Sequence, residues 1–153
     1  LDFLQRTGNE TLTLSKKIQA ALADTRTGAE YAPFNFSQSL KVVAQMIAAD
    51  VPTRVYYVSL GGFDTHAGQA NRHAGLLQEL SQGVGSFVAD LKATGHLDRT
   101  LVMTFSEFGR RVFENEQQGT DHGTAGVMFL AGGGVKAGVH GGRPDLADLD
   151  DGD

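Results

Sequence analysis

Apolar residues recur along this chain with two different spacings, and these spacings predict its elements. Steps of three or four residues predict three helices, over about 8–24, 37–49 and 71–93. Unbroken apolar runs rich in β-branched and aromatic residues predict buried strands at 54–60, 100–105 and 125–131. A helix between the first two strands indicates a crossover connection, so we expect a parallel pair within an α/β layered fold.

Local signals support the ends of these helices. Ser37 is the expected N-cap of the second helix. Thr94-Gly95 is a C-cap signal that ends the third. Inside the third helix, Gly83 and Gly85 lower helix propensity by up to about 1 kcal/mol each, and we expect them to allow a close approach to the sheet.

The length of 153 residues predicts one domain. We divide this single α/β domain into a helical part, a strand-helix-strand core and a Gly/Asp-rich tail of loops, over 1–53, 54–131 and 132–153. Within the core, residues 112–118 are expected to form a short helical turn. Because the sequence starts at Leu1 without an initiator Met, we expect it to be a piece of a longer protein.

Composition excludes several classes of function. The formal charge is −5, and no cluster of basic residues is longer than a pair, so nucleic-acid binding is disfavoured. No apolar run reaches the roughly 18 residues of a membrane span. With no cysteine, a metal ion would need histidine and carboxylate ligands, which suit zinc or manganese best and calcium as a further candidate.

Polar residues cluster at the ends of the predicted strands, where α/β folds form their binding sites. Asp64 and His66 follow the first strand, and Asp121-His122 precedes the third, between Gly119 and Gly123, which let the backbone approach closely. Asp64, His66 and His122 are candidate metal ligands. Asp121 is either a further ligand or the partner that fixes the tautomer of His122. The alternative for Asp64-Thr65-His66 is a capping carboxylate beside an exposed histidine.

The loop after the second strand adds a carboxylate and two arginines. Glu107 is a candidate oxygen ligand or catalytic carboxylate, and its alternative is a salt bridge with Arg110 or Arg111. The two arginines could instead clamp a phosphate or sulfate group, which a guanidinium binds in bidentate fashion. Ser106 lacks the Gly-x-Ser-x-Gly context of a serine-hydrolase nucleophile, so that mechanism is disfavoured.

Four blocks, in this order, resemble the domain-of-unknown-function 1501 family: Gly61–His66, Ser106–Arg110, Gly119–Gly123 and Gly132–Gly138. The resemblance implies a place in the alkaline phosphatase and sulfatase superfamily. The expected fold is then a three-layer sandwich with a mostly parallel sheet, alkaline phosphatase-like, of which this chain would be a partial domain, the C-terminal portion. It also implies export to the periplasm or the cell exterior, often with a twin-arginine signal.

The same resemblance implies roles for individual residues. Asp64 would begin a metal site, with His66 or His73 as the nearby histidine and His122 as the late one. Ser106-Glu107-Phe108-Gly109 would stand where the superfamily has Ser-Asp-His-Gly. Phe108 cannot bind a metal, so the second metal site is weakened or lost.

These features lead to one main functional hypothesis. It is a metal-dependent hydrolase of phosphate or sulfate esters, acting on a small ester or a modified polymer, with Glu107 and Arg110 as catalytic residues. The nucleophile is expected outside this chain, so we expect the chain alone to be inactive. The alternatives are a non-catalytic exported protein that binds an anion or polymer at a degenerate metal site, and a purely structural module.

Overall fold

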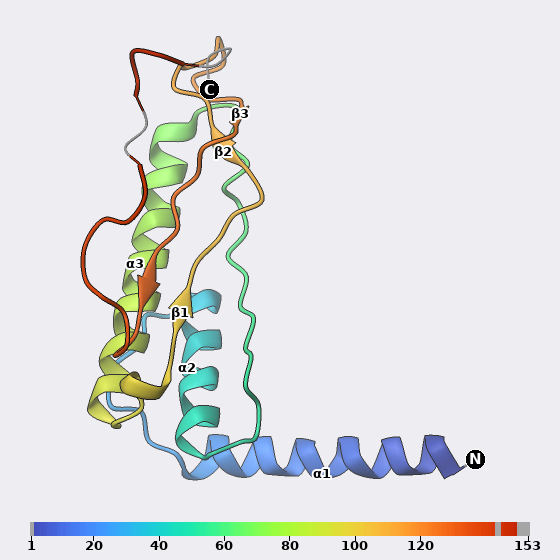
Figure 1. Ribbon diagram of the computed structural model, residues 1–153. Coiled ribbons are helices and arrows are strands. Elements are labelled where there is room, and N and C mark those ends of the chain that lie inside the picture. The colour runs from blue at the N-terminus through green and yellow to red at the C-terminus, as the bar shows by residue number, and fades with distance from the viewer. Residues whose placement is uncertain (1, 143–144, 150–153) are drawn as a thin grey trace. The chain divides into compact units, whose positions relative to one another are not determined.

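The computed structural model describes residues 2–142 and 145–149 (Figure 1). Its elements in chain order are α1 (Asp2–Asp24), α2 (Asn35–Ala48), α3 (Gln69–Ala93), the 3-10 turn η1 (Leu97–Arg99), β1 (Val102–Met103), β2 (Gly109–Arg110), β3 (His122–Gly123) and β4 (Leu130–Ala131). The three predicted helices are therefore confirmed, with earlier starts than the sequence indicates.

The chain forms two compact units, and α3 contributes to both. The helical unit comprises Leu1–Ser59 and Ser81–His96, and the loop unit comprises Leu60–Leu80 and Leu97–Asp153. Each unit has its own organisation.

The core of the helical unit lies where α2 meets the C-terminal half of α3. Phe36, Leu40 and Ala44 fall at four-residue steps on α2 and are buried, as are Phe87 and Leu91 on α3. This spacing places each set on one helix face. Gly83 packs against the ring of Phe36, so its close approach is to α2 and the expected approach to a sheet is wrong.

A buried carboxylate ties the connection between α1 and α2 to this core. The side chain of Asp90 is almost fully buried and accepts hydrogen bonds from the Gly28 N–H at 2.6 Å and the Tyr31 hydroxyl at 2.9 Å. Burial, with the adjacent Asp90 carboxylate, raises the pKa of Tyr31. A buried carboxylate needs such partners to offset its desolvation.

The helix ends agree with the sequence at one of two predicted caps. Gly95 has φ +76°, and the N–H groups of Gly95 and His96 donate to the carbonyls of Lys92 and Leu91, which is a Schellman motif. The predicted N-cap at Ser37 is wrong, because α2 begins at Asn35 and Phe34 holds the cap position without a side-chain hydrogen bond. Ser37 is instead fully buried in the first turn.

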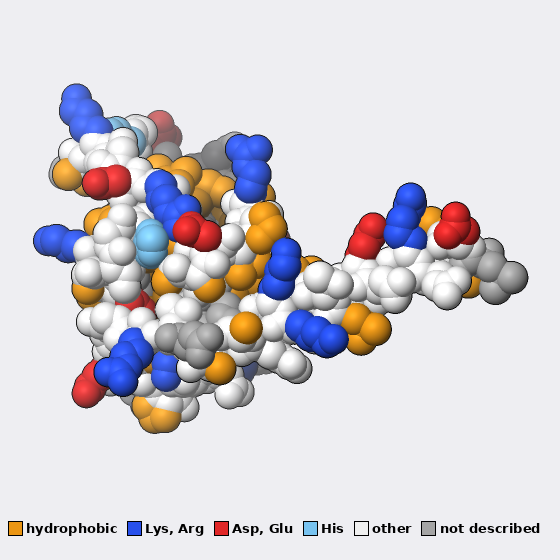
Figure 2. All heavy atoms as spheres, turned by 90° about the horizontal axis from the view of Figure 1, so that it is seen from below, with side chains coloured by type: hydrophobic (Ala, Val, Ile, Leu, Met, Phe, Trp, Pro, Cys, Tyr) orange, Lys and Arg blue, Asp and Glu red, His pale blue; other side chains and the backbone are white. Residues whose placement is uncertain are grey.

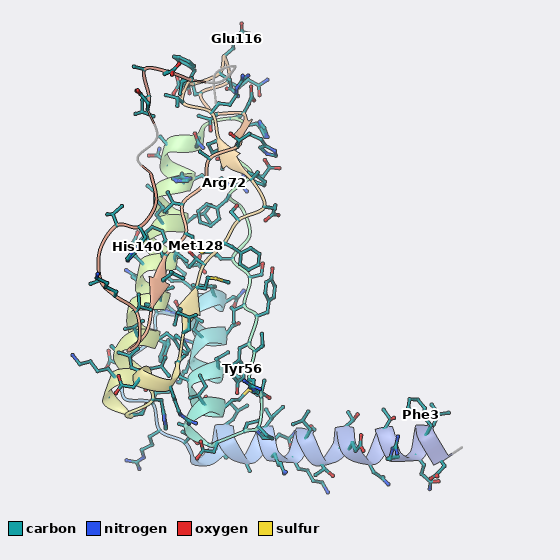
Figure 3. All side chains as sticks on the ribbon, in the orientation of Figure 1. Phe3, Tyr56, Arg72, Glu116, Met128 and His140 are labelled. Atoms are coloured by element: carbon teal, nitrogen blue, oxygen red, sulfur yellow. The ribbon has the colours of Figure 1, made fainter. Side chains whose placement is uncertain are left out.

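Helix α1 packs only near its C-terminal end. The amide of Gln45 on α2 donates to the carbonyls of Leu22 and Thr25. Toward the N-terminal end Phe3 and Leu4 are exposed. Figure 3 labels Phe3 in this part of α1, and Figure 2 shows acidic and basic side chains along the same helix. Among the described residues, the hydrogen bonds of Gln45 fix α1 at its last turn and the residue that follows it.

The predicted three-layer sandwich with a mostly parallel sheet is wrong. In the described residues, the strands form two separate antiparallel pairs, β1 with β4 and β2 with β3. Residues 54–60 are extended but belong to no ladder, and Val55 and Tyr57 are 83 % and 75 % exposed. The apolar runs at 100–105 and 125–131 form only the two-residue strands β1 and β4.

The exposure of these apolar runs explains why they did not form the predicted core strands. An unbroken apolar run becomes a core strand when layers cover both of its faces. Here Phe105, Met128 and Phe129 are more than half exposed, and Figure 3 shows Met128 on the segment before β4. Without covering layers, only the short β1–β4 ladder remains.

The remaining loops follow the sequence in part. Residues 132–142 and 145–149 contain turns and bends, as expected for the tail. The helical turn predicted at 112–118 is wrong: this segment is a loop that turns where the Gln118 N–H donates to the Asn115 carbonyl.

Candidate metal centre

All residues of the site lie in the loop unit, on three loops. The first carries Asp64 and His66, and the second carries Arg110 in β2. The third carries Asp121 and His122, at the start of β3. In Figure 1, β2 and β3 lie beside the first turns of α3, where Gln69 and Thr120 exchange side-chain hydrogen bonds.

Burial of Thr65 orients the first two side chains. Successive side chains of an extended segment point to opposite faces. Thr65 is 1 % exposed, and its hydroxyl donates to the Phe63 carbonyl. Asp64 and His66, on either side of it, therefore share the exposed face.

The β2–β3 register brings the second and third loops together. Arg110 and His122 are direct cross-strand partners. Residues paired in this way lie on the same face of a ladder. Phe108, two residues before Arg110, stacks on the His122 ring at 3.9 Å between centroids and an interplanar angle of 7°. The stack holds the plane of the imidazole.

Three donor atoms from Asp64, His66 and His122 form a tight triangle. Asp64 Oδ1 lies 2.8 Å from His122 Nε2 and 3.0 Å from His66 Nε2, and the two Nε2 atoms are 3.2 Å apart. Ligands at 2.0–2.1 Å around a tetrahedral zinc ion are about 3.3 Å apart. An outward shift of a few tenths of an ångström would therefore fit the triangle to such an ion.

Asp121 contacts the other nitrogen of His66. Its Oδ1 lies 3.2 Å from His66 Nδ1. A carboxylate only accepts hydrogen bonds, so Nδ1 carries a proton, and Nε2 then either carries a second one or offers a lone pair. A lone pair on Nε2 would point into the triangle, which is the arrangement of metal-binding histidines with an outer carboxylate. Of the two roles considered for Asp121, the structure favours the outer partner, and it acts on His66 instead of His122.

Sequence reasoning missed Asn115, which organises the third loop. Its amide nitrogen donates to the His66 carbonyl at 3.1 Å and to Asp121 Oδ1 at 3.3 Å. Its side-chain oxygen accepts from the N–H groups of Gln117 and Gly119. An Asn four residues before a Gly is the available sequence signal, because Asn side chains commonly bind the backbone of a following turn. Glu116 lies at the outer tip of this loop (Figure 3).

Gly119 is required by the approach of two backbones. It is buried, and a Cβ atom there would lie 2.2 Å from the carbonyl carbon and oxygen of His66. The close approach predicted for the glycines around Asp121-His122 is therefore confirmed at Gly119.

The charges of the site favour ionised carboxylates. The hydrogen bond with His122 lowers the pKa of Asp64, and His66 and Arg110 act in the same direction. The hydrogen bond with His66, assisted by Asn115, lowers the pKa of Asp121. Both groups are thus available as anions to a cation or to a histidine N–H.

The other predicted residues lie outside this triangle. Among the described residues, the one group able to place three donors together is Asp64, His66 and His122. Glu107 is exposed. His73 packs edge-on against Phe63, and the Ser106 hydroxyl donates to the Phe108 carbonyl. The catalytic roles of Glu107 and Arg110 stay predictions.

A family model described as "Protein of unknown function (DUF1501)" matches residues 2–151. The chain belongs to the DUF1501 family. The matched range covers nearly the whole chain and includes all three site loops. No curated protein and no solved structure was found that resembles the chain. Within the part of the chain that the structure describes, no helix is both long and apolar enough to cross a bilayer.

Proposed function

We propose that this DUF1501 chain binds a divalent cation, zinc or manganese, through Asp64, His66 and His122. The observation that carries the proposal is the triangle of donor atoms, with edges of 2.8 to 3.2 Å, together with the Asp121 carboxylate at the far nitrogen of His66. Without a cation, His66 would need a proton on both nitrogens to satisfy two carboxylates.

We propose further that the cation serves hydrolysis of phosphate or sulfate esters, as the likeness to the alkaline phosphatase and sulfatase superfamily suggests. Three protein ligands leave a coordination position open, which is typical of catalytic and not of structural zinc. The side chains of Asp64, His66 and His122 are 61 %, 45 % and 46 % exposed, so a substrate can reach them. A divalent cation held there would supply Lewis acidity.

The chain's own groups would position the reactants. Asp121 holds the proton on His66 Nδ1 and thereby directs Nε2 toward the cation. Arg110 adds positive charge beside Asp64, at 3.6 Å from its Oδ1, which suits an anionic ester or a sulfated or phosphorylated polymer. Glu107 is the proposed further carboxylate of the reaction. An exported location would accord with such a substrate.

Metal content after dialysis tests the proposal. The wild-type chain should retain about one equivalent of zinc or manganese, and Asp64→Ala and His122→Ala should lose it. His140→Ala is the matched control, because His140 is an exposed histidine whose Nε2 binds the Lys136 carbonyl. Absence of bound metal in the wild type would overturn the proposal.

Hydrolysis needs a separate measurement. A full-length DUF1501 protein carrying the same blocks should cleave phosphate or sulfate monoesters, and Glu107→Gln should slow it. Metal retained without any ester cleavage would overturn the hydrolase and leave the alternative, a non-catalytic binder of anions or polymers.

A further inference from the structure

The guanidinium of Arg110 bridges the two loops that carry the candidate ligands. Nη1 donates to the Thr120 carbonyl at 2.6 Å, and Nη2 donates to the Phe63 carbonyl. Phe63 immediately precedes Asp64, and Thr120 precedes Asp121 and His122. One side chain thus holds both ligand loops at the residue where each enters the site.

We propose that Arg110 is the positioning residue of the metal centre and sets the separation of the Asp64 and His122 donors. This inference rests on the proposed metal site. It assigns Arg110 a role that requires no contact with a substrate.

The geometry explains why an arginine serves here. A guanidinium is a planar fork whose two terminal nitrogens donate in fixed directions, whereas a lysine ammonium is a single point on a flexible chain. The Arg110 side chain is only 18 % exposed, so few water molecules compete for its hydrogen bonds. Arg110 is also the cross-strand partner of His122, and this backbone pairing fixes the position from which the Arg110 side chain extends.

The charge of Arg110 supports the same role. Two carboxylates, Asp64 and Asp121, belong to one small exposed site and repel each other. Arg110 Nη2 lies 3.6 Å from Asp64 Oδ1, so its positive charge attracts the Asp64 carboxylate. The positive charge therefore stabilises the collected donors before any cation is bound.

A positioning role and a substrate-clamping role predict different measurements. A residue that only clamps an anionic ester changes KM and leaves metal affinity intact. A residue that holds the two ligand loops changes metal affinity with no substrate present. Metal affinity in the absence of ester therefore separates the two roles.

The experiment compares Arg110→Ala and Arg110→Lys with the wild-type chain. Arg6→Ala is the matched control, because it removes the same charge from an exposed side chain of the helical unit. Zinc affinity is measured by chelator competition, and coordination geometry by the visible absorption of the cobalt-loaded protein. Both Arg110 variants should lose about 10- to 100-fold in affinity, the range seen when outer-shell partners of metal ligands are removed. Arg6→Ala should stay within about threefold of wild type.

Two controls separate positioning from folding. Far-UV circular dichroism should show wild-type helix content in both variants. Millimolar guanidinium ion should restore part of the zinc affinity and the cobalt spectrum of Arg110→Ala, because it can fill the space between the two carbonyls. Wild-type zinc affinity in Arg110→Ala and Arg110→Lys would overturn the inference.

The metal-free protein provides a test that does not depend on the proposed function. Nuclear Overhauser contacts between the His66 and His122 rings should be present in the wild-type chain and weakened in Arg110→Ala. If the wild type binds no metal, the proposed function fails, and these ring contacts still decide the inference. Unchanged ring contacts in Arg110→Ala would overturn it.

Discussion

Different interactions stabilise the interior of the helical unit and the interior of the loop unit. The helical unit buries Phe36 and Leu40 on α2, and Phe87 and Leu91 on α3. Within the loop unit, Thr65 is the buried side chain nearest the site, and hydrogen bonds from Asn115 and Arg110 to backbone carbonyls fix the loops. The difference teaches that stability and site geometry depend on separate residues, so substitutions should affect them separately.

The largest effect is expected from Leu91→Ala. Leu91 is fully buried on α3, and the cavity left by its side chain should lower the free energy of unfolding by about 2–5 kcal/mol. Urea unfolding followed by circular dichroism measures the change. Leu77→Ala is the matched control on the same helix, because Leu77 is 44 % exposed and should change stability by no more than about 0.5 kcal/mol. Equal losses in both variants would contradict the burial argument.

A smaller effect is expected from Gly119→Ala, in the loop unit. The new Cβ would overlap the carbonyl group of His66, and relieving such an overlap costs about 1–3 kcal/mol. Because the displaced backbone carries His66, zinc affinity should fall by at least about tenfold, which corresponds to about 1.4 kcal/mol. Isothermal titration calorimetry measures it.

Gly126→Ala is the control for this substitution. A Cβ at Gly126 meets nothing within 4 Å, so this variant should bind zinc like the wild type. If Gly119→Ala also binds zinc like the wild type, the geometry of the site does not depend on this backbone approach.

The smallest effect on stability is expected from Asp121→Asn. The amide can present its NH₂ group to His66 Nδ1 and thereby favour the wrong tautomer, so zinc affinity should fall about 10- to 100-fold. The free energy of unfolding should change by less than about 1 kcal/mol, because Asp121 is exposed. Asp148→Asn, at an exposed position outside the site, should change neither quantity. A loss of stability without a loss of zinc affinity would contradict the role of Asp121 in fixing the His66 tautomer.

The helices could be predicted from the sequence because their signals are local. The apolar steps of α2 and α3 and the Thr94-Gly95 cap depend on neighbours within a few residues. The strands could not be predicted in this way, because an unbroken apolar run forms a core strand only if other layers cover it. Residues 54–60 lack a ladder here, so the parallel pair expected between them and residues 100–105 does not form, and β1 pairs antiparallel with β4 instead.

The site was predictable in its residue types and less so in their roles. Asp64, His66 and His122 lie together as expected from three loops with polar residues at the ends of apolar runs. The partner of Asp121, the stacking of Phe108 on His122 and the bridging hydrogen bonds of Arg110 depend on the β2–β3 register. That register has no local signal, since Gly109 and Arg110 do not resemble a strand.

In the first loop, the buried Thr65 side chain separates two exposed donor residues. Asp64 and His66 face the same way because a single inward residue separates them. Lengthening or shortening the stretch between them by one position would turn one donor toward the interior. A second inserted residue would return that donor to the solvent side.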